Sequence, residues 1–319
     1  MAQIFITGAA GFIGFHLALA LAKRGDRVLG FDNFNSYYSP KLKRERSLLL
    51  QQAGIQVIEG DICDLATLTK CIKDHSPSHI VHLAAQAGVR YSITHPQTYV
   101  QTNIQGFLNV LECCRHNPHT KLIYASSSSV YGLNTKVPFA PEDRTDQQAS
   151  LYGVTKKANE LMAHTYHSLY GIPVTGLRFF TVYGPWGRPD MAYYSFTKAI
   201  LSGDVIEIYN QGQLKRDFTY IDDIVKGTIA AVDLGAGHEI FNLGNHQPIA
   251  LLDFVEILER TLGMKANKKF MPMQAGDVLM TYADIEHSKN KLGYIPQTTL
   301  EQGLRHFVDW YKESKGSYL

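Results

Sequence analysis

The sequence predicts an α/β fold in which a doubly wound parallel sheet is joined to a smaller, mixed α/β lobe. In the first half of the 319-residue chain, short apolar runs alternate with helical patterns. The glycine-rich segment TGAAGFIG (7–14) joins the first apolar run to the first helical pattern. Because strands that alternate with helices form a parallel sheet covered on both faces, these two observations define the fold class.

Five apolar runs are expected to be the strands of the sheet. They lie at residues 3–7, 27–31, 55–59, 79–83 and 121–125. The helical patterns between them lie at residues 12–24, 42–52, 64–74 and 97–115. A further long helix is predicted over residues 151–170, because Ser150 can cap its start while Gly171 and Pro173 mark its end.

After about residue 180 the alternation loosens. Loops rich in glycine and proline, such as GPWGRPD (184–190), are mixed there with short strands and helices. We therefore expect one domain over residues 1–180 and a second lobe over residues 181–319. Residues 217–240 are expected to pack back on the first domain.

The composition excludes several classes of protein. A net charge of +2 provides no strong field for nucleic acid or an anionic membrane. The four cysteines form no C-x-x-C pair, which favours reduced thiols. No run of about 18 apolar residues and no signal peptide is visible, so a cytoplasmic protein is expected. The 13 histidines join no carboxylate or cysteine at a metal-binding spacing, so no metal is predicted.

The glycine-rich segment is typical of a dinucleotide site in a Rossmann-type fold. Gly8 permits a tight turn, Gly11 lets the backbone approach a pyrophosphate, and Gly14 lets the helix pack close to the sheet. The spacing G-x-x-G-x-x-G is one residue longer than the usual fingerprint. Asp32 follows the second strand, where a carboxylate can bind ribose hydroxyls and repel a 2′-phosphate, so NAD is favoured over NADP. The alternative role for Asp32 is a loop cap.

The other candidate contacts to the dinucleotide lie at the start of the first helix and after the predicted strands. They are Phe12, Ile13, Asn33, Asp61, Ile62, Leu83, Ala84, Ala85 and Asn103, together with Tyr152 and Lys156.

Tyr152 and Lys156 stand four residues apart and therefore share one face of the long helix. A lone tyrosine is a poor base, because its pKa is about 10. An ammonium and an oxidised nicotinamide nearby both favour the phenolate. Together with Ser127 upstream, the pair predicts a base that works near neutral pH. Taken alone, the same spacing also fits a solvated pair on a helix surface.

Seven segments resemble the extended short-chain dehydrogenase/reductase group of nucleotide-sugar enzymes. Besides TGAAGFIG they are FDNFNSYY (31–38), HLAAQAGVRYS (82–92), YASSSSVYG (124–132), YGVTKKANE (152–160), LRFFTVYGPWGRPDMA (177–192) and RDFTYIDDIVKG (216–227). The segments 31–38, 84–92 and 177–192 look most like the UDP-glucuronate 4-epimerase branch. The resemblance covers nearly the whole chain.

The resemblance implies an isomerase that converts UDP-glucuronate to UDP-galacturonate through a transient 4-keto sugar, with NAD as its cofactor. In this scheme Tyr152 is the base, Ser127 assists it, and Lys156 binds the nicotinamide ribose. The second lobe would bind the UDP-sugar. The resemblance also implies a homodimer formed through the two helices near 97–115 and 151–170.

The resemblance further implies a set of substrate contacts. Ser128 and Ser129 stand where related dehydratases and decarboxylases carry acids, and Thr181 replaces an Asn common among relatives. These hydroxyls are expected to hold the sugar carboxylate and so to slow loss of carbon dioxide from the 4-keto uronic acid. The remaining expected contacts are Arg188 and Arg216 to the pyrophosphate and Asp277 on the uridine side. Arg90 is expected either to touch the sugar or to orient the 84–92 loop.

Other functions remain open at this stage. VLMT (278–281) and MAYY (191–194) depart from the pattern of the branch, which leaves the nucleotide contacts and the exact uronic acid open. A 4-epimerase for UDP-glucose or a UDP-N-acetylhexosamine is the first alternative. A UDP-glucuronate decarboxylase is the second. A dinucleotide-binding regulatory module without catalysis is the third, and the intact set Ser127, Tyr152 and Lys156 argues against it.

Overall fold

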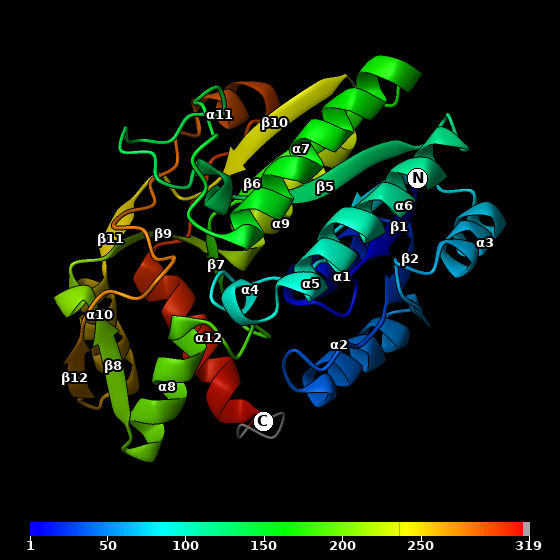
Figure 1. Cartoon of the computed structure of the whole chain (residues 1–319). Helices are drawn as coiled ribbons and strands as arrows, with labels where there is room; N and C mark the ends of the chain where they lie inside the picture. Colours follow the sequence, from blue (N-terminus) through cyan, green and yellow to red (C-terminus); the bar gives the residue numbers. More distant parts are fainter. Residues whose placement is uncertain (236, 315–319) are drawn as a thin grey trace.

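A seven-stranded parallel sheet forms the centre of the larger part of the molecule (Figure 1). The computed structural model describes residues 1–235 and 237–314. The strand order is β10-β6-β5-β4-β1-β2-β3. The strands are β1 (Gln3–Thr7), β2 (Arg27–Asp32), β3 (Gln56–Glu59), β4 (His79–His82), β5 (Lys121–Ser127), β6 (Val174–Phe179) and β10 (His238–Leu243). The predicted fold class and its five strands are confirmed, and the sheet gains β6 and β10 at one edge.

Helices cover both faces of this sheet. On one face α1 packs against α2 and α9, and on the other α6 packs against α3 and α7. Their bounds are α1 (Phe12–Lys23), α2 (Pro40–Gln52), α3 (Leu65–His75), α6 (Phe107–Arg115), α7 (Leu151–Tyr170) and α9 (Ile221–Leu234). The order of strands reverses between β1 and β4, and ligands bind beyond the carboxyl ends of strands at such a point in open α/β sheets.

The long helix α7 has the predicted bounds and the predicted ends. The Ser150 hydroxyl accepts a hydrogen bond from the Gly153 N–H at 3.1 Å, which satisfies one free donor of the first turn. Gly171 adopts the left-handed conformation, with φ of 68°, and ends the helix. These two caps fix the turn of α7 on which Tyr152 lies.

The helix expected over residues 97–115 is confirmed, with a local change of winding. It runs without interruption from α5 (Pro96–Tyr99) through the π-helical segment η1 (Val100–Gly106) to α6, and the short helix α4 (Tyr91–Thr94) precedes it. Inside η1, the Asn103 carbonyl accepts a hydrogen bond from the Asn159 amide at 2.6 Å. A side chain that occupies a helix carbonyl in this way favours the wider π turn, which is frequent at functional sites.

The second lobe combines two small sheets with four helices. Its sheets have the orders β11-β9-β7 and β12-β8. The strands are β7 (Thr181–Tyr183), β8 (Val205–Tyr209), β9 (Lys215–Tyr220), β11 (Pro248–Ala250) and β12 (Asn267–Met271). The helices are α8 (Ala192–Ser202), α10 (Leu251–Leu262), α11 (Glu286–Leu292) and α12 (Leu300–Glu313), with the short 3₁₀ turn η3 (Asn210–Gly212). A second 3₁₀ turn, η2 (Ser128–Tyr131), follows β5 in the larger part.

The chain crosses between the two parts, so the expected boundaries describe interleaved segments. β10 pairs with β6 in the large sheet, and α9 packs on α1. The segment 217–240 contains the whole of α9 and the first half of β10. The last five residues of the expected second lobe, 315–319, lie outside the described residues. Within the described residues, no helix has the length and apolar character needed to cross a membrane.

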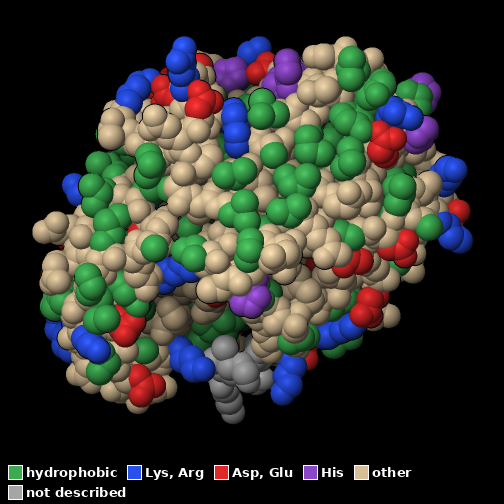
Figure 2. Space-filling model, viewed as in Figure 1, with side chains coloured by type: hydrophobic (Ala, Val, Ile, Leu, Met, Phe, Trp, Pro, Cys, Tyr) green, Lys and Arg blue, Asp and Glu red, His purple; other side chains and the backbone are tan. Residues whose placement is uncertain are grey.

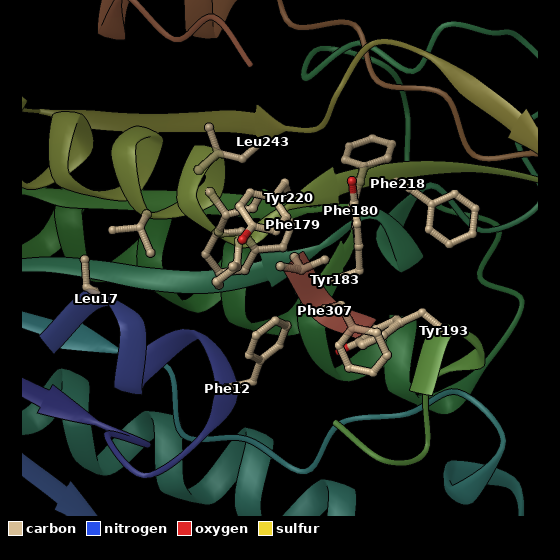
Figure 3. Packing of buried hydrophobic residues seen from close by; sticks show 14 of the residues in the cluster. Phe12, Leu17, Phe179, Phe180, Tyr183, Tyr193, Phe218, Tyr220, Leu243 and Phe307 are labelled. Atoms are coloured by element: carbon tan, nitrogen blue, oxygen red, sulfur yellow. The ribbon is translucent and has the colours of Figure 1, made fainter. Parts of the chain in front are cut away.

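One hydrophobic core extends through both parts (Figure 3). It joins Phe12 and Leu17 of α1 to Tyr193 of α8 and Phe307 of α12. Figure 3 shows aromatic residues of β6, β7 and β9 filling the space between these helices. Because closely packed cores deform little, this shared core holds the two lobes in a fixed relation across the cavity described next.

Candidate active site

A cavity of about 970 Å³ lies between the carboxyl ends of the large sheet and the second lobe. Ser127 at the end of β5 and Tyr152 and Lys156 on α7 line it, as do the three glycines of the loop after β1. The second lobe contributes residues from β7, α8 and β9. The cavity lies at the upper end of the range of about 300–1,000 Å³ that is usual for small-molecule and cofactor sites, so it can hold a large ligand.

The glycine-rich loop is built so that only glycine fits. A Cβ atom on Gly8 would lie 2.6 Å from the Ala84 nitrogen, and one on Gly14 would lie 2.2 Å from the Gly8 carbonyl oxygen. Gly8 also has a φ of 73°, in the left-handed region. The backbone of this loop and the start of α1 therefore face the cavity without side chains, as an approach to a pyrophosphate requires.

Asp32 lies at the end of β2 and is tied to the same loop. Its carboxylate accepts hydrogen bonds from the Ala10 N–H at 3.0 Å and the Phe34 N–H at 2.8 Å. The bond from Phe34 is the loop cap considered as the alternative, and Asp32 also lines the cavity. Burial raises the pKa of Asp32, against the opposing effect of these backbone donors and of Lys43 and Arg46. The structure thus combines the two suggested roles in one residue.

The other residues expected near the cofactor divide into two groups. Seven line the cavity: Phe12, Ile13, Asn33, Ile62, Leu83, Ala84 and Ala85. Asp61 and Asn103 are not among the lining residues. The Asp61 carboxylate accepts from the Asn33 amide at 2.9 Å, and Asn103 bonds both the N–H and the carbonyl of Gln86. These two residues support the lining loops.

Ser127, Tyr152 and Lys156 meet at one end of the cavity. The Lys156 ammonium, which is buried, donates to the Ala125 carbonyl at 2.9 Å. The Ser127 hydroxyl accepts from the Ser129 N–H at 3.1 Å and caps η2. Burial lowers the pKa of Lys156 to about 8. The three predicted residues are thus brought together by β5 and α7.

The electrostatics of Tyr152 differ from the sequence-based expectation. Burial raises the pKa of its phenol, while a hydrogen bond with Ser127 and the charge of Arg188 lower it without cancelling that effect. The sequence suggested Lys156 as the nearby positive charge. In the structure the guanidinium of Arg188, from the loop before α8, exerts this influence. Tyr152 therefore stays protonated at neutral pH unless a further cation lies beside it.

The expected substrate contacts all line the same cavity. Ser128 and Ser129 belong to η2, and Thr181 begins β7. The remaining four are charged: Arg90, Arg188, Arg216 and Asp277. Arg90 and Arg216 approach the Asp277 carboxylate from two sides, at 3.5 and 3.9 Å, so these three form one cluster.

Sequence reasoning missed a second charged cluster in the cavity. The Asp190 carboxylate binds the Arg188 guanidinium and accepts a hydrogen bond from the Tyr37 hydroxyl at 3.1 Å. Tyr37 and Asp190 both occur inside the segments that carried the resemblance, but they are 153 positions apart. No local pattern connects them. Across the described residues, no group of three His, Cys, Asp or Glu side chains is arranged to hold a metal ion.

Comparisons with known proteins agree with this geometry. Residues 4–244 match the model of the NAD dependent epimerase/dehydratase family. The chain is 55% identical to UDP-glucuronate 4-epimerase 4 of Arabidopsis thaliana over 97% of this chain and 75% of that protein. It is 54% identical to UDP-glucuronate 4-epimerase 3 of the same plant, over 97% and 76% of the two chains.

Solved structures are also similar over nearly the whole chain. The UDP-glucuronic acid 4-epimerase of Bacillus cereus, in complex with UDP-glucuronic acid and NAD, superposes with a TM-score of 0.91 at 38% identity and covers 97% of this chain and 99% of its own. The UDP-glucose 4-epimerase of Thermotoga maritima with UDP-glucose gives 0.90 at 30% identity, with coverages of 98% and 99%. This chain belongs to the NAD dependent epimerase/dehydratase family.

Proposed function

We propose that the chain is an NAD-dependent isomerase that interconverts UDP-glucuronate and UDP-galacturonate. One observation of the structure carries this proposal: Ser127, Tyr152 and Lys156 share a cavity with the hydroxyls of Ser128, Ser129 and Thr181. The first set can remove and return a proton. The second set can hold a carboxylate but cannot protonate a leaving group, as a dehydratase must. The high identity to curated UDP-glucuronate 4-epimerases supports the same substrate.

The residues present fit the dinucleotide. Gly8, Gly11 and Gly14 leave backbone room for its pyrophosphate, and Asp32 is placed for the ribose hydroxyls. When bound, NAD would supply the acceptor for a hydride from C4 of the sugar and the donor for its return to the opposite face of the ring. The net redox change is then zero, so the cofactor is expected to stay bound through the cycle.

The protein groups handle the proton. Tyr152 takes it from the 4-hydroxyl of the sugar and later gives it back, while the Ser127 hydroxyl stabilises the phenolate by hydrogen bonding. Lys156 is held by the Ala125 carbonyl and can contact the nicotinamide ribose with its remaining donors. Each turnover thus leaves these three residues in their starting state.

The hydroxyl set addresses a hazard of this substrate. A 4-keto uronic acid is a β-keto acid, which loses carbon dioxide when its carboxylate turns perpendicular to the ring carbonyl. Hydrogen bonds from Ser128, Ser129 and Thr181 would keep the carboxylate near the ring plane. The cluster of Arg90, Arg216 and Asp277 supplies two cations and one acceptor for the pyrophosphate and uridine.

We also infer the domain roles and an assembly. Residues 1–180 with 217–240 form the NAD-binding domain, and residues 181–319 form the UDP-sugar lobe. Figure 2 shows apolar side chains gathered over α6 and α7. They include Val154, Leu161 and Leu169, which are 45%, 57% and 66% exposed. Such a patch supports the predicted homodimer. The cytoplasmic location expected from the sequence stays a prediction.

A product assay tests the proposed function. The purified protein is incubated with UDP-glucuronate, UDP-glucose or UDP-N-acetylglucosamine, and the products are resolved by chromatography. We expect UDP-galacturonate from the first and much slower change of the other two. A UDP-pentose as the main product would indicate a decarboxylase instead. Faster conversion of a neutral sugar would indicate a 4-epimerase for UDP-glucose or a UDP-N-acetylhexosamine.

A further inference from the structure

Asp190 binds the guanidinium of Arg188 through two hydrogen bonds inside the cavity. The Arg188 Nε donates to Asp190 Oδ1 at 3.1 Å, and Nη2 donates to Oδ2 at 2.5 Å. The two side chains are 22% and 30% exposed. These two bonds use Nε and Nη2, and Nη1 takes no part in them. The fork therefore fixes the plane of the guanidinium, which lines the cavity and can bind an anionic ligand there.

Tyr37 also binds the Asp190 carboxylate. Its hydroxyl donates to Asp190 Oδ2 at 3.1 Å, and its ring packs on the Tyr91 ring with a centroid distance of 5.0 Å. A Cβ atom on Gly88 would lie 2.5 Å from the Tyr37 hydroxyl, so the close approach requires glycine there. Tyr37 lies five residues after Asp32, in the segment next to the expected ribose site.

The backbone around Arg188 is tied to the glycine-rich loop as well. The fully buried Arg46 of α2 donates to the Ala10 carbonyl at 2.9 Å. The same guanidinium donates to the Trp186 carbonyl at 2.6 Å and the Gly187 carbonyl at 3.2 Å. Both ends of the Tyr37–Asp190–Arg188 contact are thus anchored to the loops expected to bind the cofactor.

We propose that Asp190 is a positioning residue that orients the Arg188 guanidinium toward the anionic groups of the substrate. Tyr37, through its hydrogen bond to Asp190, links this orientation to the cofactor-binding segment. The proposal rests on the proposed function for the identity of the substrate. An arginine side chain has many rotamers, and holding it in place before binding removes the entropy that the substrate would otherwise have to overcome.

The charge states suit this arrangement. Burial alone would raise the pKa of Asp190, but the charge and hydrogen bonds of Arg188 and the Tyr37 hydroxyl outweigh burial and hold it below its usual value. Burial, followed by the charge of Asp190, raises the pKa of Tyr37 to about 12. Tyr37 therefore remains a hydrogen-bond donor and Asp190 an acceptor throughout the neutral range.

The test uses the NAD-loaded protein and two variants, Asp190→Asn and Tyr37→Phe. Titration calorimetry with UDP and the KM for UDP-glucuronate are measured for each. We expect Asp190→Asn to raise the Kd for UDP or the KM at least about tenfold, and Tyr37→Phe about threefold, with kcat changing less. A loss confined to UDP-glucuronate places the Arg188 contact at the sugar and supports the proposal equally. Asp26→Asn is the matched control, because Arg24 and Asp26 form an ion pair of the same spacing outside the cavity.

A double-mutant cycle separates positioning from a merely structural role. In an Arg188→Ala background, Asp190→Asn is expected to cost nothing further, because its effect passes through Arg188. Additive losses, an unchanged Kd and KM in Asp190→Asn, or tighter UDP binding would each overturn the proposal. If Asp190→Asn does not fold, Tyr37→Phe decides, and wild-type values there would overturn it. A wild-type protein that binds UDP but does not turn over UDP-glucuronate refutes the proposed function while leaving this test intact.

Discussion

A buried ion pair next to the reacting groups yields the most quantitative prediction. Glu160 and Arg178 are each 2% exposed and are joined by two hydrogen bonds, of 2.8 Å from Nε and 2.9 Å from Nη2. The Ser126 hydroxyl donates to the same carboxylate at 2.6 Å. Ser126 precedes Ser127 on β5, and Glu160 lies one turn beyond Lys156 on α7. The Glu160 carboxylate therefore joins α7 to β6 through Arg178 and to β5 through Ser126.

Replacing Glu160 by Gln leaves the buried guanidinium of Arg178 without its counter-charge. Breaking a buried pair in this way costs about 3 to 5 kcal/mol. Since each kcal/mol lowers Tm by about 2 °C in a chain of this size, Tm is expected to fall by about 6 to 10 °C. Turnover is expected to fall too, because α7, which carries Tyr152 and Lys156, loses its ion pair with β6.

Calorimetric melting of the NAD-loaded protein measures this effect, and Glu59→Gln is the matched control. Arg44 and Glu59 form the same two-point contact on the surface, with side chains 53% and 58% exposed. Exposed pairs contribute little, so the control is expected to melt close to the wild type. Equal and small Tm changes in both variants would refute the reasoning that burial makes the Glu160–Arg178 pair important for stability.

Three further predictions concern the reaction. Tyr152→Phe is expected to lower turnover by at least about a hundredfold while bound NAD, measured by its absorbance after denaturation, is retained; near-normal turnover would exclude Tyr152 as the base. Combined alanine substitutions at Ser128, Ser129 and Thr181 are expected to increase the UDP-pentose fraction of the products, and an unchanged product ratio would contradict the proposed restraint on the carboxylate. Because the pKa of Lys156 falls from 10.5 to about 8 on folding, the folded state binds fewer protons in this range. Stability should therefore rise more steeply from about pH 8 to about pH 10 in the cofactor-free wild type than in Lys156→Met, as urea unfolding can measure, and identical slopes would argue against the lowered pKa.

The parts of the fold that local chemistry determines could be predicted. The caps at Ser150 and Gly171 set the bounds of α7, and the alternation of strands and helices set the first five strands. β6 was missed because every residue of Val174–Phe179 is buried, so no alternation distinguishes it from a helix segment. β10 joins the sheet from 60 residues further along the chain, which no local pattern reveals. The π-helical turn near Asn103 accompanies a hydrogen bond from a side chain of α7, Asn159, and periodicity does not reveal it.

The candidate site likewise contains residues that short motifs predict and contacts that they do not. The glycines, Asp32, and the Tyr152 and Lys156 pair belong to short motifs whose chemistry is local. By contrast, the contact between Tyr37 and Asp190 joins residues 153 positions apart, and the contact between Arg46 and Trp186 joins residues 140 positions apart. Such pairs arise from the packing of the two lobes, so a single sequence carries no signal for them.

The charge on Tyr152 links the two halves of the proposed reaction. Burial keeps its phenol protonated, and the combined effect of Ser127 and Arg188 is too small to reverse this. Lys156 contributes little to the phenol while its ammonium is bound to the Ala125 carbonyl. A phenolate at neutral pH therefore requires one more positive charge beside the ring, and an oxidised nicotinamide carries that charge. It follows that the phenolate is expected only with oxidised cofactor bound, and that losing this charge would raise the pKa of the phenol again, so that Tyr152 would keep its proton until the positive charge is restored.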